Sequence, residues 1–355
     1  MDAKNETIAT LLHVAMYLNR SIPIPLLIFG TIGNILNVFI LTRQSLRTNS
    51  CAFYFLSSTL ANILCLWIGL LTRLLSGYNL DPTAWSTVVC QIRFYITYMS
   101  LSLSACFLVY ASVDRWASSS TNPNIRSFSR IHNARRMVMY TTLFACVFYG
   151  QTFYCYVAVP NQFPLNCYCP NQVCRTYNDV LFLILFSLIP PMFMLSFGYV
   201  TIRNVQKIRQ QVRPLPANLQ ASRQQHRLLK KKDHQMIMML LVQVFFFVIL
   251  VTPSGISKAY STLTFNQLKD SLELTKENFF FQVSVLILYI NCCSAFYLYT
   301  LTGKIFRQEV KRLLLNIQRP NLAIISEVRI IPPDPISAAY HSQTNQITMK
   351  YNQQT

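Results

Sequence analysis

The stretch LSACFLVYASVDRWASSS, from Leu103 to Ser120, decides how the rest of the sequence is read. Residues 94–113 are twenty uncharged residues, and an adjacent acid and base, Asp114 and Arg115, follow them. A helix crosses the hydrocarbon core of a membrane in about 20 apolar residues. The stretch therefore predicts a membrane-spanning helix that ends in an Asp-Arg pair. That pair is either a charged boundary at the membrane face or a working part of the protein.

The composition indicates that several such helices are present. Of the 355 residues, 52% are hydrophobic and 12% are charged, whereas soluble domains carry about 25% charged residues. Seven uncharged runs are long enough to span a membrane, and the fourth is long enough to include a loop as well. The runs are 21–42, 48–72, 94–113, 137–174, 180–202, 234–257 and 278–303. The sequence thus predicts an all-α membrane protein with a bundle of seven transmembrane helices.

The net charge of +19 is concentrated on one side of the predicted bundle. With the N-terminus outside, 23 of the 31 Lys and Arg residues and 5 of the 12 Asp and Glu residues fall on the inner side. This is the positive-inside pattern of multi-pass membrane proteins. Topology and contact with anionic membrane lipids explain the basic excess, so nucleic-acid binding is not expected. We expect a plasma-membrane protein with its C-terminus in the cytoplasm.

The sequence divides into four regions. Residues 1–20 form an extracellular tail, with glycosylation sequons at Asn5 and Asn19, of which Asn19 lies almost against the first span. Residues 21–303 form the seven-helix bundle. Residues 304–317 place apolar side chains at helical spacing between Lys and Arg, which predicts a short amphipathic helix on the membrane surface. Residues 318–355 are polar without a sustained period, which predicts a disordered cytoplasmic tail.

Polar residues within the spans have two explanations. Asn34, Asn62, Ser104 and Asn291 fall in four different spans. Such groups are costly in a membrane, so they either hydrogen-bond neighbouring helices together or mark a functional site. Pro253 in the sixth span is either a tolerated kink or a pivot. Taken singly, each residue is explained by helix packing alone.

The eleven cysteines divide by predicted compartment. Seven lie in or beside spans and are expected to act as small apolar residues: Cys51, Cys65, Cys106, Cys146, Cys155, Cys292 and Cys293. Four fall on the oxidising side and allow three pairings: Cys90, Cys167, Cys169 and Cys174. The histidines are scattered away from these cysteines, so no metal site is expected, and no cofactor is expected either.

Taken in order, the chain resembles the rhodopsin-like G-protein-coupled receptors from about Ile22 to Ile317. The residues that carry the resemblance are Gly33-Asn34 in the first span, Cys90 and Asp114-Arg115-Trp116 at the two ends of the third, Pro191 and Tyr199 in the fifth, Asp233, Phe247 and Pro253 in the sixth, Tyr299 near the end of the seventh, and Phe306 after it. The departures are Asn62 for the usual Asp, Trp116 for Tyr, Val251 for Trp and Ala295-Phe296 for Asn-Pro. The usual tryptophan of the fourth span is not evident.

The resemblance implies roles for these residues. Coupling to a heterotrimeric G protein would use an activation switch made of Asp114, Arg115, Trp116, Tyr199, Asp233, Phe247, Pro253 and Tyr299. In the resting state, Arg115 is expected to contact Asp233. The resemblance also implies a Cys90–Cys167 disulfide, with Cys169–Cys174 as a possible second bridge. Arrestin and a receptor kinase are further partners that the C-terminal tail would engage.

The expected ligand follows from the same comparison. Thr97, Val251 and Tyr289 are the candidate pocket residues. Amine receptors keep an aspartate at the position of Thr97, and opsins keep a retinal-binding lysine at the position of Tyr289. An amine or retinal is therefore not expected, and the long cysteine-bearing loop is typical of a neuropeptide receptor, by analogy with invertebrate-type members.

Three alternatives stay open at this point. A seven-helix channel or transporter would need ionisable residues along a central pathway, and the predicted spans contain almost none between their ends. An enzyme would need an acid-base pair, a nucleophile or a metal cluster, and the spans show no such set. A receptor-like protein that has lost coupling is compatible with the departures from the family pattern.

Overall fold

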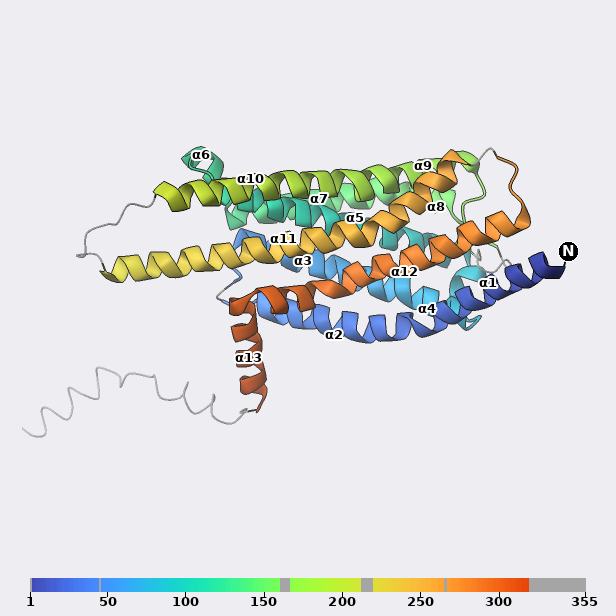
Figure 1. Cartoon of the computed structure of the whole chain (residues 1–355), viewed down its shortest axis with the longest axis horizontal. Coiled ribbons are helices and arrows are strands. Elements are labelled where there is room, and N and C mark those ends of the chain that lie inside the picture. The colour runs from blue at the N-terminus through green and yellow to red at the C-terminus, as the bar shows by residue number, and fades with distance from the viewer. Residues whose placement is uncertain (1, 45, 160–166, 212–219, 265–266, 319–355) are drawn as a thin grey trace, which may run out of the picture. The chain divides into compact units, whose positions relative to one another are not determined.

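Helices make up nearly all of the computed structural model, which describes residues 2–44, 46–159, 167–211, 220–264 and 267–318 (Figure 1). Within these ranges, side chains are described except at residues 2, 208–211, 220–234 and several positions of the last helix. The chain divides into one unit of residues 1–307 and another of residues 308–355.

Among the described residues, seven helical crossings build the first unit, some from consecutive helical segments. They are α1 (Asp2–Ser21) with α2 (Pro23–Leu41); α3 (Ser50–Leu64), η1 (Cys65–Leu70) and α4 (Leu71–Gly77); α5 (Thr87–Ser118); α7 (Ile131–Phe148), η3 (Tyr149–Gln151) and α8 (Thr152–Cys155); α9 (Gln172–Phe182), η4 (Leu183–Leu188) and α10 (Ile189–Gln211); α11 (Gln220–Leu263); and α12 (Ser271–Thr302). Short connecting elements are η2 (Pro82–Ala84), α6 (Pro123–Arg126) and the antiparallel strands β1 (Val157–Ala158) and β2 (Cys167–Tyr168). The predicted all-α seven-helix bundle is confirmed.

Within the described part of the chain, six crossings contain a helical stretch that is long and apolar enough to span a membrane. The fourth crossing is not among them, because the 3-10 turn η3 ends α7 after 18 residues, and these are too polar, with Arg135 and Arg136 in the first half. The same uncharged run continues through α8 into the strand pair. The loop that the sequence predicted within this run is therefore present.

Local sequence signals explain where the crossings begin and bend. The Asn49 side chain caps α3 by accepting from the Cys51 N–H at 3.0 Å, and Ser86 and Asp270 cap α5 and α12 in the same way. The π-helical segment η4 directly precedes Pro190 and Pro191 at the start of α10. Proline has no N–H to donate to the preceding turn, so the regular hydrogen-bond pattern is lost there.

Residues 2–21, which include all but the first residue of the predicted extracellular tail 1–20, form the helix α1. It packs against α12 and α4, and its Ala15 and Asn19 are buried. Pro23 at the first turn of α2 marks the boundary between the two helices, because proline fits the first helical turn, where its missing N–H has no intrahelical partner. The first crossing is consequently longer at this end than the uncharged run 21–42 suggested.

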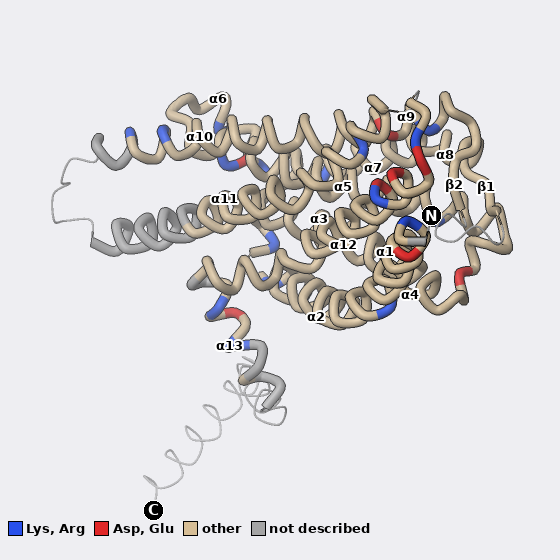
Figure 2. Tube along the Cα trace, turned by 45° about the vertical axis from the view of Figure 1, so that its right-hand side comes forward, with Lys and Arg blue, Asp and Glu red and all other residues tan. Residues whose placement is uncertain are grey.

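Many large apolar side chains of the bundle face outward, and several polar side chains lie inside it together with the apolar core. Phe39 and Val147 are 57% and 82% exposed, whereas Asn34 and Asn62 are 1% and 2% exposed. Lipid is the solvent for the outer surface, so exposed phenylalanine and valine are stable there. Figure 2 shows the described charged residues gathered toward the two ends of the helices. This distribution agrees with a bundle that crosses a membrane.

The helix α13 (Lys304–Gln318) begins directly after Gly303. In the first unit, Phe306 packs against Phe296 and Tyr299, with ring centroids 5.9 and 5.7 Å apart. A helix is present where one was predicted for residues 304–317, and its amphipathic role at the membrane surface stays a prediction. Residues 319–355, nearly all of the predicted tail, lie outside the described residues.

Candidate functional site

Two polar regions lie at opposite ends of α5. The disulfide end surrounds Cys90 in the first turns, and the Arg115 end surrounds Asp114 and Arg115 in the last turns. Arg115 follows Cys90 by 25 positions, which corresponds to a separation of about 38 Å at 1.5 Å per residue. A chemical event at one end therefore acts on the other only through the helices between them.

Two disulfides tie the loop between α8 and α9 to the bundle. Cys90 is joined to Cys167, the pair that the resemblance implied. Cys174 is joined to Cys155, so the possible Cys169–Cys174 bridge is wrong. The expectation that Cys155 is an ordinary apolar residue is also wrong. The turn η3 changes the helical path just before Cys155, and the Cα atoms of Cys155 and Cys174 lie 5.6 Å apart, within disulfide range.

Cys169 keeps a free thiol beside the second disulfide. The sulfur atoms of Cys155, Cys169 and Cys174 lie within 4.8 Å of one another. Because two of these three sulfurs are bonded to each other, Cys169 alone among them can supply a thiolate, which is too few ligands for a zinc site. Burial raises the pKa of the Cys169 thiol and keeps it protonated.

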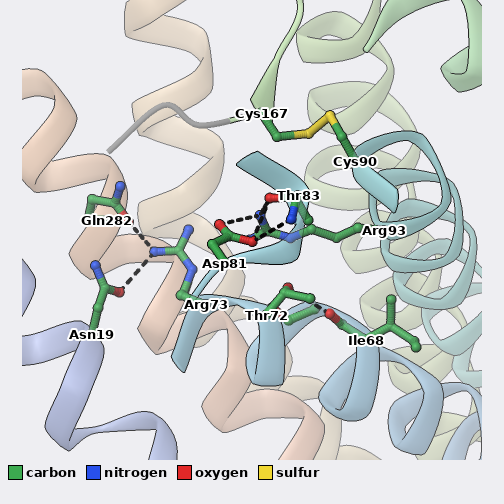
Figure 3. A network of polar contacts seen from close by, with 11 residues as sticks. Asn19, Ile68, Thr72, Arg73, Asp81, Thr83, Cys90, Arg93, Cys167 and Gln282 are labelled. Atoms are coloured by element: carbon green, nitrogen blue, oxygen red, sulfur yellow. Dashed lines mark hydrogen bonds and ion pairs between the residues drawn. A yellow bond between two sulfur atoms is a disulfide. The ribbon is translucent and has the colours of Figure 1, made fainter. Parts of the chain in front are cut away.

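Three cationic side chains enter the bundle near the disulfide end. Figure 3 shows two of them, Arg73 of α4 and Arg93 of α5. The Arg93 guanidinium lies 4.0 Å from the buried Asp81 carboxylate, which also accepts hydrogen bonds from Thr83. On the other side of the bundle, Lys258 of α11 lies 2.5 Å from a carboxylate oxygen of Asp179 on α9. These two cations thus have acidic partners in the protein.

Arg73 differs from the other two cations in its partners. Its Nη1 donates to the side-chain oxygens of Asn19 on α1 and Gln282 on α12, and both acceptors are neutral amides. Its Nε is buried without a hydrogen-bond partner. Asn19 is itself 4% exposed, so in this structure it cannot carry the glycan that its sequon allows, whereas Asn5 is exposed on α1.

Two of the three predicted pocket residues, Thr97 and Tyr289, lie against Gly69, one helical turn before Arg73. A Cβ added at Gly69 of η1 would lie 2.4 Å from the Tyr289 hydroxyl and 3.1 Å from the Thr97 hydroxyl. Gly69 therefore permits the close approach of α5 and α12 side chains to the second crossing, at a π-helical segment of the kind often found at functional sites. Val251 is buried on α11 at 1% exposure.

Aromatic side chains continue this region toward α7 and α9. The Phe94 and Tyr156 rings stack with centroids 4.0 Å apart, and the Tyr156 hydroxyl donates to Tyr98 at 3.1 Å. A small pocket lies beside Tyr98, with Tyr149 and Phe186 among its lining residues. The disulfide end thus combines cations, hydroxyl groups and aromatic rings.

Three of the four predicted polar core residues take part in two separate side-chain contacts. Ser104 donates to the Asn62 side chain at 2.8 Å, and Ser58 lies 2.8 Å from the same Ser104 hydroxyl. Asn34 donates to the Cys292 carbonyl at 3.0 Å, which links α2 to α12. Asn291 is buried on α12. The arrangement offers neutral oxygen atoms and no carboxylate at Asn62.

One buried polar residue of this core was missed. Asn37 is 0% exposed, and neither of its amide atoms has a hydrogen-bond partner. A signal was available, because Asn37 follows Asn34 by three residues and so shares its helix face. The unpaired amide makes Asn37 a candidate position for a bound water.

The surroundings of Asp114 and Arg115 distinguish between the two interpretations of this pair, a charged boundary at the membrane face or a working part of the protein. The side chains of Arg115 and Asp114 are 2% and 4% exposed, so the pair is not a charged boundary facing water. Arg115 donates through Nε to Asp114 at 3.1 Å and through Nη2 to the same oxygen. The other carboxylate oxygen accepts from Ser129 at 2.8 Å, and Ser129 lies 3.3 Å from Ser50 of α3. Sequence reasoning missed these serines, because their position depends on how the connecting segment folds.

The neighbouring switch candidates pack in different ways. Trp116 contacts Phe197 of α10, with ring centroids 5.3 Å apart. Tyr199 is 60% exposed and lies beneath the Arg203 guanidinium, so it faces away from the bundle interior. The side chain of Asp233 lies outside the described residues, and its predicted contact with Arg115 stays a prediction.

The remaining candidates link α11 to its neighbours. Tyr299 is buried and donates to the side chain of Gln243, a residue that sequence reasoning did not single out. Phe247 packs against Phe186 of η4 at 5.5 Å between ring centroids. Pro253 lies inside the continuous helix α11, and the adjacent Ser254 donates to the Ser284 carbonyl at 2.9 Å.

Comparison with known proteins places this geometry in context. A family model described as 7 transmembrane receptor (rhodopsin family) matches residues 33–295. The matched region includes the disulfide end, the polar core and the buried Asp114–Arg115 pair. No curated protein matches the chain.

Proposed function

The chain belongs to the rhodopsin family of seven-transmembrane receptors, and on this premise we propose that it binds an extracellular peptide and activates a heterotrimeric G protein. The observation that carries the proposal is the buried Asp114–Arg115 pair, at the opposite end of α5 from the disulfide-linked loop. Coupling between a ligand and a partner protein requires two distinct sites joined by the fold. The disulfide end and the Arg115 end supply them.

The orientation proposed for the chain rests on chemistry at the two ends. Disulfides form in oxidising compartments, which supports placing Cys90–Cys167 and Cys155–Cys174 outside the cell. The excess of Lys and Arg on the other side supports a cytoplasmic location for Arg115 and for the C-terminus. The protein is then a multi-pass component of the plasma membrane, with its N-terminus outside.

A peptide ligand suits the groups at the disulfide end. Arg73, Arg93 and Lys258 reach inward from three different helical crossings, and aromatic rings such as Phe94 and Tyr156 lie between the loop and α5. A peptide presents several side chains and a polar backbone to such a spread of donors and rings. Our proposal is therefore a neuropeptide receptor, with arrestin and a receptor kinase as partners of residues 318–355.

The proposed signal is a movement of α11 about Pro253. In the structure, Tyr299 and Gln243 connect α12 to α11, and Arg115 is held by Asp114. Outward movement of α11 breaks the first contact and opens the inner face, where Arg115 becomes available to a G protein. The competing candidate is a receptor-like protein without coupling, which the departure at Trp116 and its packing on Phe197 favour.

Expression of the chain in cultured cells with a peptide library tests the proposal. At least one peptide should raise intracellular calcium or change the cyclic-nucleotide level, and Arg115→Ala should abolish that response while peptide binding is retained. Arg126→Ala, which removes an exposed arginine of α6, is the control for general loss of positive charge. Peptide binding without any signal in the wild type would favour the uncoupled alternative.

A further inference from the structure

Arg73 is a cation with no acidic partner among the described side chains. Among the residues that the structure describes, no carboxylate lies within 4.0 Å of its guanidinium, in contrast to Arg93 beside Asp81 and Lys258 beside Asp179. Arginine stays charged at all physiological pH values, so Arg73 cannot escape the problem by losing its proton. A charge in a membrane-spanning segment without a counter-charge is costly and tends to be retained for function.

Structural hydrogen bonds within the protein use only some of the donors of the Arg73 guanidinium. The bonds to Asn19 and Gln282 tie α4 to α1 and α12, and both use the same nitrogen, Nη1. The Nε–H is buried and has no acceptor. Leaving a buried donor unsatisfied costs about 1–3 kcal/mol, and more when the group is charged. The Nε–H of the guanidinium is therefore a buried donor for which the described residues supply no acceptor.

A second unsatisfied donor lies on the neighbouring helix. The Thr97 hydroxyl of α5 is buried without a hydrogen-bond partner, and it lies together with the Tyr289 hydroxyl against Gly69. Gly69 precedes Arg73 by four residues, so both face the same side of the second crossing. Arg73 also lies within electrostatic range of Tyr289 and of the second cation, Arg93. Two hydroxyl groups thus lie against Gly69, one helical turn from Arg73, and a second cation lies within electrostatic range.

We infer that this place is a carboxylate-binding site, in which Arg73, Thr97 and Tyr289 hold an acidic group of the ligand. A carboxylate accepts several hydrogen bonds at once, and bonds between a guanidinium and a carboxylate are charge-assisted and strong. It would satisfy the Nε of Arg73 and the Thr97 hydroxyl together, and it would supply the missing negative charge. That the carboxylate belongs to the receptor's ligand rests on the proposed function.

A peptide can supply this carboxylate from two positions. One is the free carboxylate at the C-terminus, and the other is the side chain of an Asp or Glu residue. N-acetyl-phenylalanine represents the first, with N-acetyl-phenylalanine amide as its neutral match. N-acetyl-aspartate N-methylamide represents the second, with N-acetyl-asparagine N-methylamide as its match. Each pair differs in charge and keeps nearly the same shape.

The experiment measures the unfolding temperature of the purified full chain in lipid nanodiscs against the concentration of each compound, at constant ionic strength. A ligand that binds the folded state alone raises this temperature in a saturable way. We expect at least one acid to do so, with its neutral match giving no comparable rise. Which acid is active identifies the source of the carboxylate. Equal effects of acid and neutral match in both pairs would overturn the inference.

Variants then locate the site. Arg73→Gln should weaken binding of the active acid about ten-fold or more, because a charge-assisted hydrogen bond is lost. Arg20→Gln is the matched control, since Arg20 donates to the Gly77 carbonyl near the same end, and it should leave the affinity unchanged. Thr97→Val, which keeps the side-chain shape, should weaken binding several-fold and covers the case in which Arg73→Gln fails to fold. An acid that stabilises the variants and the wild type equally would place the anion elsewhere and refute the assignment.

The result of the unfolding-temperature experiment does not depend on whether the protein signals. Nanodisc stability reports the carboxylate site even if no G protein is activated, and a signalling receptor whose stability is indifferent to both acids would retain the proposed function without this site.

Discussion

Replacing Asp114 by asparagine removes one charge from the buried pair at the Arg115 end and keeps a side chain of the same shape. In the structure, one carboxylate oxygen accepts two bonds from Arg115 and the other accepts one from Ser129 at 2.8 Å. Arg115 is 2% exposed, so a partner protein cannot reach it in this arrangement. With respect to Arg115, the structure therefore represents the resting state of the proposed receptor.

The size of the effect follows from burial. Removing one member of a buried ion pair costs about 3–5 kcal/mol, because a buried charge loses the attraction of its counter-charge. If the substitution destabilises the resting state more than the active state, the equilibrium between the two states shifts toward the active one, in which Arg115 is released from Asp114. A differential of about 1–3 kcal/mol corresponds to a shift of about 5–150-fold. We therefore expect Asp114→Asn to raise ligand-independent signalling at least about five-fold.

Ser129→Ala separates the charge from the hydrogen bond. It leaves the ion pair in place and removes a single bond worth about 0.5–1.5 kcal/mol, so its effect should have the same direction and a smaller size. Ser127→Ala is the matched control, because the Ser127 hydroxyl bonds to the Asn124 carbonyl within its own turn. Basal signalling normalised to surface expression is the assay. A normally expressed Asp114→Asn receptor with wild-type basal activity, alongside a wild type that responds to ligand, would refute this reasoning.

Three further predictions concern other parts of the bundle. Cys90→Ser should lower surface expression and ligand binding, because loss of a native disulfide costs about 2–5 kcal/mol; unchanged expression in a flow-cytometric assay would contradict the role given to the Cys90–Cys167 bridge. Asp233→Ala should raise basal signalling several-fold if Asp233 holds Arg115 at rest, and an unchanged basal level would leave Asp233 as a helix-end charge. Ligand affinity should not respond to Na⁺ at constant ionic strength, because Asn62 and Ser104 offer a cation no counter-charge; a drop specific to Na⁺ in a binding assay would show that a cation site exists.

The fold was largely predictable because membrane spans obey a simple physical constraint. Each crossing needs about 20 apolar residues, and lipid allows few charges between the ends. The same reasoning failed at Cys155, because uncharged composition does not reveal the 3-10 turn η3 that changes the helical path before it. A run of apolar residues specifies that a segment enters the membrane, and the place where its regular helix breaks depends on packing.

The candidate site was predictable only in part for a related reason. Thr97 and Tyr289 were selected through the family resemblance, and the structure brings them together across Gly69. Arg73 was not selected, because its neutral partners come from distant segments, Asn19 of α1 and Gln282 of α12. Contacts between residues far apart in the chain depend on tertiary packing, which a single sequence does not display.

Nucleotide exchange on a purified G protein tests the central claim most directly. The full chain in nanodiscs, a panel of G-protein heterotrimers and a labelled non-hydrolysable GTP analogue are sufficient, because exchange is measured without any cellular pathway. We predict that the chain accelerates exchange on at least one heterotrimer, that Asp114→Asn increases this acceleration, and that Arg115→Ala removes it. Folded protein in which neither the wild type nor Asp114→Asn accelerates exchange on any member of the panel would contradict the claim that the Arg115 end activates a G protein.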